Sequence, residues 1–195
     1  MTKINYIDNY DSFASTIAAY FQMAGAEVRI FKSDCNLETA VSGNPDFILL
    51  GPGPNGPKDA GNYMKLLEKY HKELPFFGIC LGFQAMMEYF GQPVKPLEDI
   101  VHGDSVLISH NSKGIFEGIE QGAHFARYNS LGVYQVPQCF ELTANSNGIV
   151  MAAAHKSLPI QGVQFHPESV LSTRNENGMK IVRNVINQYG QNIVK

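Results

Sequence analysis

Residues 3–90 alternate between short apolar runs and longer segments whose apolar residues recur at helical spacing. The apolar runs predict four strands, at Lys3–Ile7, Glu27–Phe31, Phe47–Leu50 and Pro75–Ile79. The other segments predict helices at Phe13–Ala24, Leu37–Val41, Met64–Glu73 and Gln84–Phe90, the first with Asp11 or Ser12 as its N-cap. Strands and helices that alternate at this spacing predict a parallel sheet with right-handed crossovers.

From Gly91 onward the pattern changes to shorter β-like pieces. These pieces lie at Ser105–Ile108, His124–Tyr128, Phe140–Ala144, Ile149–Ala153 and Ile160–Phe165. The tail from Gly178 to Tyr189 again has helical spacing and is expected to pack back onto the sheet. We therefore predict a single α/β domain over residues 1–195. It should have three layers, with an open, mixed, mostly parallel sheet, helices on both faces and added antiparallel strands.

Prolines and glycines alternate through Gly51–Gly61, directly after the third predicted strand. Such a segment is expected to form a rigid loop without regular structure. One interpretation is a plain connector, but the prolines make the loop stiffer than a connection requires. Ligands bind at the carboxyl ends of strands in open α/β sheets, so we expect this loop and the turn after Pro75–Ile79 to face the same crevice.

Charge and composition exclude several classes of protein. Lys and Arg number 15 against 18 Asp and Glu, for a net charge of −3, so no nucleic-acid or membrane partner is expected. The chain has no apolar run long enough to span a bilayer and no signal-like N-terminus, which predicts a cytoplasmic protein. The cysteines at positions 35, 80 and 139 are odd in number and widely spaced, which argues against a disulfide framework and a cysteine-based zinc site.

Cys80 lies between a predicted strand and a predicted helix, in the segment Gly78-Ile79-Cys80-Leu81-Gly82. The two glycines leave room for a strained turn that pushes the central side chain outward, as in a nucleophile elbow. The helix that follows brings free N–H groups and a positive dipole end close to the sulfur, which favours a reactive cysteine. From this stretch alone, a small buried hydrophobic residue is an equally good interpretation.

The segment Gln164-Phe165-His166-Pro167-Glu168 offers partners for this cysteine. Pro167 is expected to hold the segment extended, where residues two apart point the same way, so His166 and Glu168 should project together. A carboxylate beside an imidazole fixes its tautomer, which is the third-group role in a catalytic triad. The other histidines are interpreted as structural or exposed, with His102 the least clear. No second ligand lies at metal-binding spacing, so no metal is expected.

Taken together, these stretches resemble the class I, triad-type glutamine amidotransferases, in particular the small glutaminase subunits of anthranilate synthase and aminodeoxychorismate synthase. The resemblance covers nearly the full length. Its motifs occur in the family's order, at Asp8–Phe13, Pro52–Pro54, Asp59–Gly61, Gly78–Gly82, His102-Gly103, Arg127-Tyr128, Ser130-Leu131 and Gly162–Ser169. Several separate motifs in one order are far more specific than any single motif.

The resemblance implies a thioester mechanism that uses no cofactor and no metal. The Cys80 thiolate would attack the side-chain carboxamide of L-glutamine. His166 would carry the proton to the departing ammonia, and Glu168 would orient His166. Water would then release glutamate.

The resemblance also implies which groups bind the substrate. The oxyanion would be held by the backbone N–H of Leu81 and by one from the loop around Gly53. Gln84 and the backbone of Ser130 and Leu131 would hold the glutamine head group.

The chain departs from the family pattern at four positions. Asn55 replaces the last glycine of a loop that usually reads Pro-Gly-Pro-Gly, but asparagine tolerates left-handed backbone better than other non-glycine residues, so Asn55 stays among the expected binding residues. Phe83 and Asn129 stand where histidines are usual. Asp104 stands where a lysine is usual, a charge reversal that bears on contact with a partner.

Ammonia released into neutral water becomes ammonium and is no longer a nucleophile. The resemblance and the chain length together therefore predict a complex with a larger chorismate-using synthase that receives the ammonia. Two other classes stay open: a stand-alone γ-glutamyl hydrolase, and a weakly catalytic scaffold subunit that binds its synthase. The sequence does not separate the tryptophan branch from the folate branch.

Overall fold

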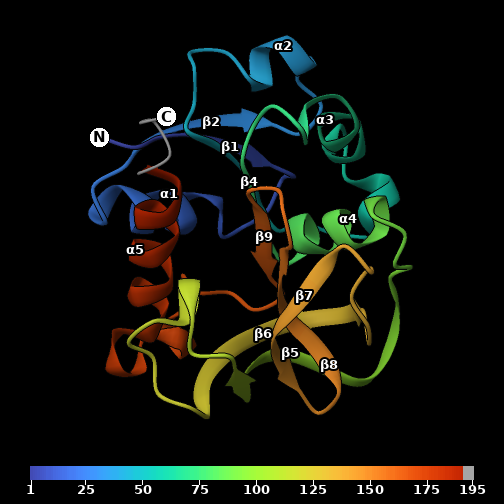
Figure 1. Ribbon diagram of the computed structural model, residues 1–195, viewed down its shortest axis with the longest axis vertical. Helices are drawn as coiled ribbons and strands as arrows, with labels where there is room; N and C mark the ends of the chain where they lie inside the picture. The colour runs from blue at the N-terminus through green and yellow to red at the C-terminus, as the bar shows by residue number, and fades with distance from the viewer. Residues whose placement is uncertain (191–195) are drawn as a thin grey trace.

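The computed structural model describes residues 1–190, and its strands form one nine-stranded mixed sheet (Figure 1). The strand order across the sheet is β2-β1-β3-β4-β9-β8-β7-β5-β6. The strands are β1 (Lys3–Asp8), β2 (Glu27–Lys32), β3 (Phe47–Leu50), β4 (Phe76–Ile79), β5 (Lys95–His110), β6 (Ala123–Gly132), β7 (Phe140–Ser146), β8 (Ile149–His155) and β9 (Ile160–Val163). The α-helices are α1 (Ala14–Met23), α2 (Leu37–Ala40), α3 (Tyr63–Tyr70), α4 (Leu81–Tyr89) and α5 (Asn177–Gly190).

The sheet has a parallel half and an antiparallel half. Strands β2, β1, β3, β4 and β9 are parallel to one another, and β8, β7, β5 and β6 continue the sheet in antiparallel pairs. Helices α1 and α5 cover one face of the parallel half, and α3 and α4 cover the other (Figure 1). The predicted three-layer α/β fold with a mixed, mostly parallel sheet is confirmed. The predicted domain ends at residue 195, beyond the described residues.

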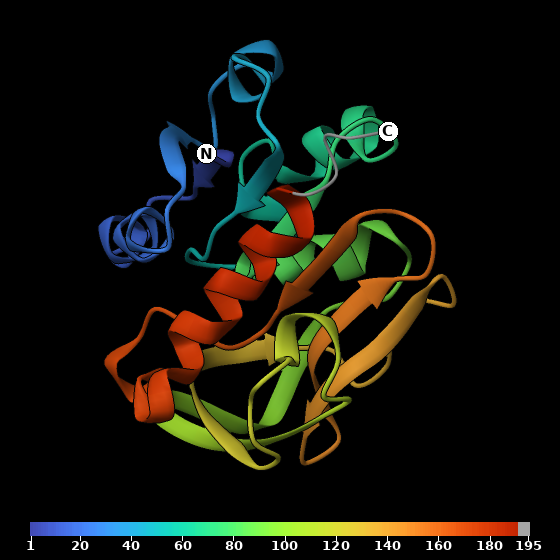
Figure 2. The same ribbon diagram turned by 60° about the vertical axis from the view of Figure 1, so that its left-hand side comes forward.

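The central strands are buried on both faces, as their continuous apolar sequences require. All four residues of β3 and all four of β4 are buried, whereas the edge strand β2 is mostly exposed. Helix α5 packs over one face of these strands and lies in front of them in Figure 2. Its Tyr189 ring lies 4.9 Å from the ring of Phe47, and the Tyr189 hydroxyl donates to the carbonyl of Phe76 at 2.9 Å.

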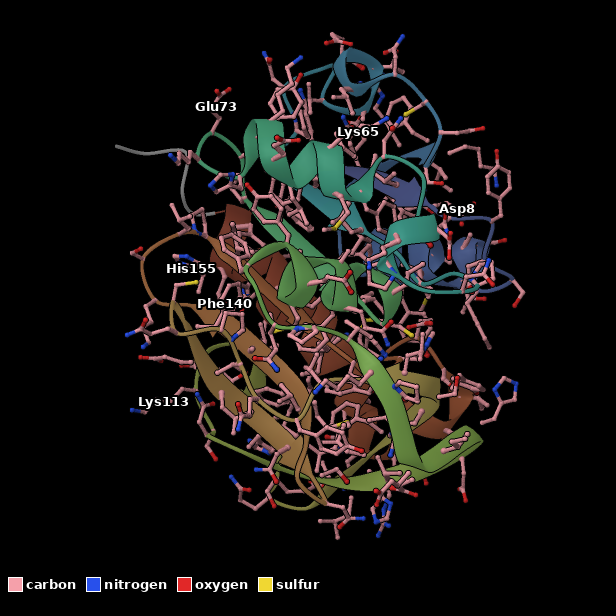
Figure 3. The ribbon with its side chains drawn as sticks, turned by 90° about the vertical axis from the view of Figure 1, so that its right-hand side faces the viewer. Asp8, Lys65, Glu73, Lys113, Phe140 and His155 are labelled. Atoms are coloured by element: carbon pink, nitrogen blue, oxygen red, sulfur yellow. The ribbon has the colours of Figure 1, made fainter. Side chains whose placement is uncertain are left out.

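The antiparallel half carries its own aromatic contacts. Phe140 at the start of β7 is paired with His155 at the end of β8 (Figure 3). Their rings meet edge to face with centroids 5.0 Å apart. This contact gives His155 a structural role, as the sequence predicted.

Two expectations, one about the start of α1 and one about the loop after β3, were wrong. No side chain caps α1: its N-cap is Phe13, and Asp11 instead accepts the Phe13 N–H at 2.7 Å. The loop after β3 is also less irregular than expected. Pro57–Asp59 forms one turn of 3-10 helix, because Pro57 has the fixed φ that suits a first helical position.

Strand boundaries in the second half of the chain differ from the prediction, and β6 ends at Gly132 where Tyr128 was predicted. β5 runs from Lys95 to His110, far beyond the predicted Ser105–Ile108, and irregular register near Pro96 and Gly103 hides the strand in the sequence. β9 ends at Val163, because the chain then turns toward β6. Beyond the strand, His166 makes only an isolated bridge to Ala126.

Candidate active site

Cys80 occupies a strained turn between β4 and α4. Its backbone has φ 52° and ψ −103°, a conformation that L-residues rarely adopt. A Cβ on Gly78 would lie 2.6 Å from the Phe83 nitrogen, and a Cβ on Gly82 would lie 2.1 Å from the Leu50 carbonyl oxygen. Only glycine therefore fits on either side of the cysteine. The elbow expected from the spacing is present, and α4 begins at Leu81, three residues earlier than predicted.

His166 is fixed in place by its own backbone. Its N–H donates to the Ala126 carbonyl at 3.0 Å. The Ser172 hydroxyl donates to the His166 carbonyl at 2.6 Å and accepts the Ala126 N–H at 2.9 Å. The segment that carries His166 is thereby pinned to β6 from both sides.

The backbone between His166 and Glu168 differs from the extended segment that the sequence predicted. The segment after His166 is a turn, closed by the Ser169 N–H donating to the His166 carbonyl at 3.3 Å, rather than an extended stretch. Glu168 Oε1 nevertheless lies 2.7 Å from His166 Nδ1, with both side chains almost fully buried. The predicted pairing of the two side chains is therefore present, but the turn and not an extended backbone produces it.

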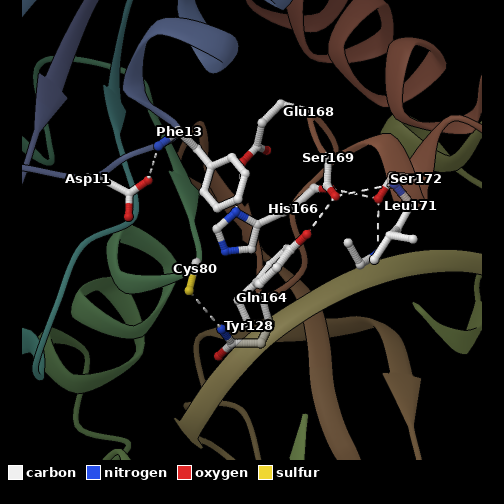
Figure 4. Close-up of polar contacts among 11 residues, drawn as sticks. Asp11, Phe13, Cys80, Tyr128, Gln164, His166, Glu168, Ser169, Leu171 and Ser172 are labelled. Atoms are coloured by element: carbon white, nitrogen blue, oxygen red, sulfur yellow. Dashed lines mark hydrogen bonds and ion pairs between the residues drawn. The ribbon is translucent and has the colours of Figure 1, made fainter. Parts of the chain in front are cut away.

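The other ring nitrogen of His166 points toward the Cys80 sulfur (Figure 4). It has no hydrogen-bond partner among residues 1–190. Burial lowers the pKa of His166, but the attraction of Glu168 and Cys80 outweighs it, so the pKa is raised well above 6.5. The ring is thus poised to accept a proton from the direction of the sulfur.

Two aromatic rings hold the imidazole from its sides. The centroid of the His166 ring lies 5.6 Å from that of Phe13 and 5.0 Å from that of Tyr128, the latter edge to face. The Tyr128 hydroxyl and the Ser169 hydroxyl are 2.9 Å apart, which ties the ring to the turn beside Glu168 (Figure 4). The chemistry of the single residues in the sequence did not identify Phe13, Tyr128 or Ser169 as part of the site. The only signal for them was their place within the family motifs.

A pocket of about 610 Å³ opens above the cysteine. Both Cys80 and His166 line it, and Glu168 lies behind His166. The pocket is also lined by every residue expected to bind substrate, namely Gly53, Asn55, Leu81, Gln84, Ser130 and Leu131. His102, whose role the sequence left open, lies at the pocket as well.

The loop that carries Gly53 is packed tightly on the end of β1. A Cβ on Gly53 would lie 2.8 Å from both the Cβ and the carbonyl oxygen of Asn9. Asn9 is buried, and its Oδ1 accepts the Ser33 hydroxyl at 2.6 Å. Asn55 has φ 64°, in the left-handed region that asparagine was expected to tolerate. Asn9, from the Asp8–Phe13 motif, therefore packs against the loop and supports it.

The opposite wall of the pocket is organised around the Leu131 carbonyl. Gln84 Nε2 and Asn129 Nδ2 both donate to it at 2.8 Å. Arg127, which is completely buried, donates through Nε to Asn129 Oδ1 at 3.0 Å and through its other nitrogens to Asp99. The departure at Asn129 thus belongs to the network that shapes this wall.

The other two departures lie outside the pocket lining. Phe83 belongs to α4 and is fully buried in the core, beside Gly162. Asp104 is exposed on β5 and accepts the Ser105 N–H at 2.7 Å.

Comparison with known proteins identifies the family. The family described as glutamine amidotransferase class-I matches residues 5–187. The chain belongs to this family. Among solved structures, a protein with the same fold is a putative GMP synthase component from Thermoplasma acidophilum. It has a TM-score of 0.86 and 25% identity, over 97% of this chain and 94% of that chain.

Two curated relatives are more similar in sequence. Anthranilate synthase component 2 of Methanocaldococcus jannaschii is 38% identical over 94% of this amidotransferase and 96% of the relative. The aminodeoxychorismate/anthranilate synthase component 2 of Bacillus subtilis is 36% identical over 96% of this chain and 97% of the relative. Both relatives are named as the second component of a synthase.

Residues 1–190 contain neither a helix that could span a membrane nor a group of side chains placed to bind a metal ion. No helix in that range is long and apolar enough to cross a membrane. No group of three His, Cys, Asp or Glu side chains there is arranged to hold a metal ion.

Proposed function

We propose that this amidotransferase is the glutaminase subunit of a chorismate-using synthase. It hydrolyses L-glutamine to glutamate through a Cys80 thioester and delivers the ammonia to a larger partner. The observation that carries the proposal is that Cys80 and His166 line one pocket, with Glu168 behind His166 and 2.7 Å from its Nδ1. No observation favours a stand-alone γ-glutamyl hydrolase or a scaffold subunit. The whole chain, residues 1–195, acts as one domain in the cytoplasm.

The reaction begins when His166 Nε2 takes the proton of the Cys80 thiol and the sulfur attacks the carboxamide carbon of glutamine. Glu168 stabilises the imidazolium that forms, through the 2.7 Å contact with Nδ1. The carbonyl oxygen becomes an oxyanion, and backbone N–H groups of Leu81 and the Gly53 loop stabilise it. Leu81 is suited to this role because the first N–H groups of a helix have no acceptor within the helix.

Collapse of this intermediate breaks the C–N bond. His166 gives its proton to the departing nitrogen, so that ammonia leaves and a γ-glutamyl thioester remains on Cys80. Water then attacks the thioester while His166 takes one of its protons. The sulfur leaves, takes the proton back from His166, and glutamate is released.

The rim of the pocket supports the assignment of a protein partner. Tyr10 and Ile100 line the pocket and yet are 59% and 63% exposed. Large apolar side chains that are exposed in this way are typical of a surface that binds another protein. A partner seated there would close the pocket to solvent and keep ammonia in its uncharged, nucleophilic form. The component 2 names of the relatives support an anthranilate synthase or aminodeoxychorismate synthase as that partner.

The proposal is tested by measuring glutamate release from glutamine. The purified chain is assayed alone, with an anthranilate synthase large subunit plus chorismate, and with the aminodeoxychorismate synthase large subunit plus chorismate. Cys80→Ser serves as the blank. We expect release that rises with a partner and is absent from the blank, and the partner that stimulates it identifies the branch. Equal release in Cys80→Ser, or no release with either partner, would overturn the proposal.

A further inference from the structure

The side chain of Gln164 lies between the substrate wall and the nucleophile. It is completely buried, just beyond the end of β9. Its Nε2 is 3.5 Å from the Cys80 sulfur (Figure 4). Its Oε1 accepts a hydrogen bond from Gln84 Nε2 at 3.0 Å. The steps of glutamine hydrolysis given above leave this amide without a role, although it contacts the attacking atom.

Neighbouring groups fix which end of this amide faces the sulfur. Arg127 can only donate hydrogen bonds, so its partner atom on Asn129 must be the oxygen, and Asn129 presents its NH₂ group to the Leu131 carbonyl. That carbonyl can only accept, so the atom of Gln84 that faces it must also be nitrogen.

The same reasoning extends one residue further. Because the nitrogen of Gln84 also faces Gln164, the facing atom of Gln164 must be its oxygen. The Gln164 NH₂ group is then left to face the Cys80 sulfur. The Leu131 carbonyl at one end of this chain of hydrogen bonds thus orients the donor at the other end.

We propose that Gln164 holds and activates the nucleophile by donating an N–H hydrogen bond to the Cys80 sulfur. A donor aimed at a buried sulfur stabilises the thiolate more than the thiol and holds the sulfur on the pocket side of the elbow. The same amide is bonded to Gln84, so it also links the substrate wall to the nucleophile. The proposal deepens the glutaminase function and rests on it.

The first test measures alkylation of Cys80 by iodoacetamide in the absence of glutamine and partner, with mass spectrometry separating it from the other two cysteines. We expect Gln164→Leu to slow alkylation about tenfold or more at neutral pH, because a hydrogen bond to a charged group is lost. Gln84→Leu should slow it less than about threefold, since Gln84 only supports Gln164. The matched control is Gln161→Leu, on β9 and outside the pocket lining, which should react like the wild type.

The second test separates activation of the sulfur from support of the substrate wall. In the partner-stimulated glutaminase assay, Gln164→Leu should lower kcat about tenfold or more, whereas Gln84→Leu should mainly raise KM. Thermal unfolding of each variant checks that it is folded, and the unbranched Gln164→Met takes the place of Gln164→Leu if the latter does not fold.

Alkylation of the Gln164 variant at the wild-type rate would overturn the proposal. So would slowing no larger than in Gln84→Leu, because Gln164 would then act only through Gln84. Alkylation requires neither glutamine nor partner. A failure of the glutaminase proposal would therefore appear as absent glutamate release with the alkylation pattern intact.

Discussion

Glu168 Oε1 lies 2.7 Å from His166 Nδ1, in a site where both side chains are almost fully buried. Burial disfavours a charged imidazole, yet the attraction of Glu168 and Cys80 raises the pKa of His166 well above 6.5. The folded protein therefore binds this proton more tightly than the unfolded chain does. The resulting stabilisation is complete below the unfolded pKa of about 6.5 and is lost as the pH rises through the folded pKa.

We accordingly predict that the free energy of unfolding falls as the pH is raised from 6 to 9. Glu168→Gln removes the main attraction, so its curve should be flatter over the same range. The measurement is urea unfolding at several pH values, with Cys80→Ser as a further variant that isolates the contribution of the sulfur. A Glu168→Gln curve as steep as that of the wild type would show that Glu168 does not set the protonation of His166.

A second prediction concerns Tyr128, whose ring packs against His166. Tyr128→Phe keeps the ring that is 5.0 Å from His166 but removes the hydroxyl that is 2.9 Å from Ser169. Its stability should fall by about 1 kcal/mol, as for a single hydrogen bond, with kcat reduced less than tenfold. Tyr128→Ala also removes one wall of the imidazole site and should lower kcat further. Urea unfolding and the glutaminase assay measure these effects, and equal kcat in the two variants would exclude a positioning role for the ring.

Local sequence was sufficient wherever local forces decide the structure. The uninterrupted apolar run at Phe47–Leu50 predicted a strand with the bounds that β3 has. The glycines two residues either side of Cys80 predicted the elbow, and at Gly78 the steric need for glycine comes from the turn itself, whereas at Gly82 it comes from Leu50 on β3.

Contacts between distant segments were not predictable in this way. The turn at Pro167 forms because Ser172 and Ala126 hold the backbone of His166, and Ala126 is 40 residues away in the sequence. The full length of β5 depends on its pairing with β6 across irregular register, not on its own alternation of residues. The burial of Arg127 was not predictable from the sequence, since only the fold places Asp99 and Asn129 against it.

Asn129 provides a third prediction, about the substrate wall. Asn129→Asp keeps an acceptor for Arg127 Nε but replaces the NH₂ that faces the Leu131 carbonyl with an oxygen. The two oxygens repel, so the wall should shift and KM for glutamine should rise about tenfold, the equivalent of one lost hydrogen bond to a carbonyl. The glutaminase assay measures KM, and a wild-type value would show that this contact does not shape the wall.

Asn129→Ala is the companion variant, because it removes both contacts of the side chain. It leaves the Arg127 N–H buried without its acceptor, so stability should fall by about 1–3 kcal/mol. Urea unfolding should therefore separate the two variants, with Asn129→Asp the more stable. The opposite order would mean that Arg127 finds another acceptor when Asn129 is truncated.

Two glycines in the loop after β3, Gly53 and Gly56, allow a test of whether this loop donates a hydrogen bond to the oxyanion. A Cβ on Gly53 would lie 2.8 Å from the backbone oxygen of Asn9, whereas a Cβ on Gly56 would meet only the Leu131 side chain, at 3.7 Å. Gly56 has φ −117°, which any residue adopts. Gly53→Ala should therefore displace the loop, and Gly56→Ala should be accommodated.

We expect Gly53→Ala to lose about 1–3 kcal/mol of stability through overpacking. Its kcat for glutamate release should fall about a hundredfold if the loop supplies an oxyanion donor. Alkylation of Cys80 should remain near the wild-type rate, because the elbow itself is unchanged. Gly56→Ala should match the wild type in all three measurements. Full glutaminase activity in a folded Gly53→Ala variant would remove this loop from the oxyanion hole and leave the N-terminus of α4 as its main donor.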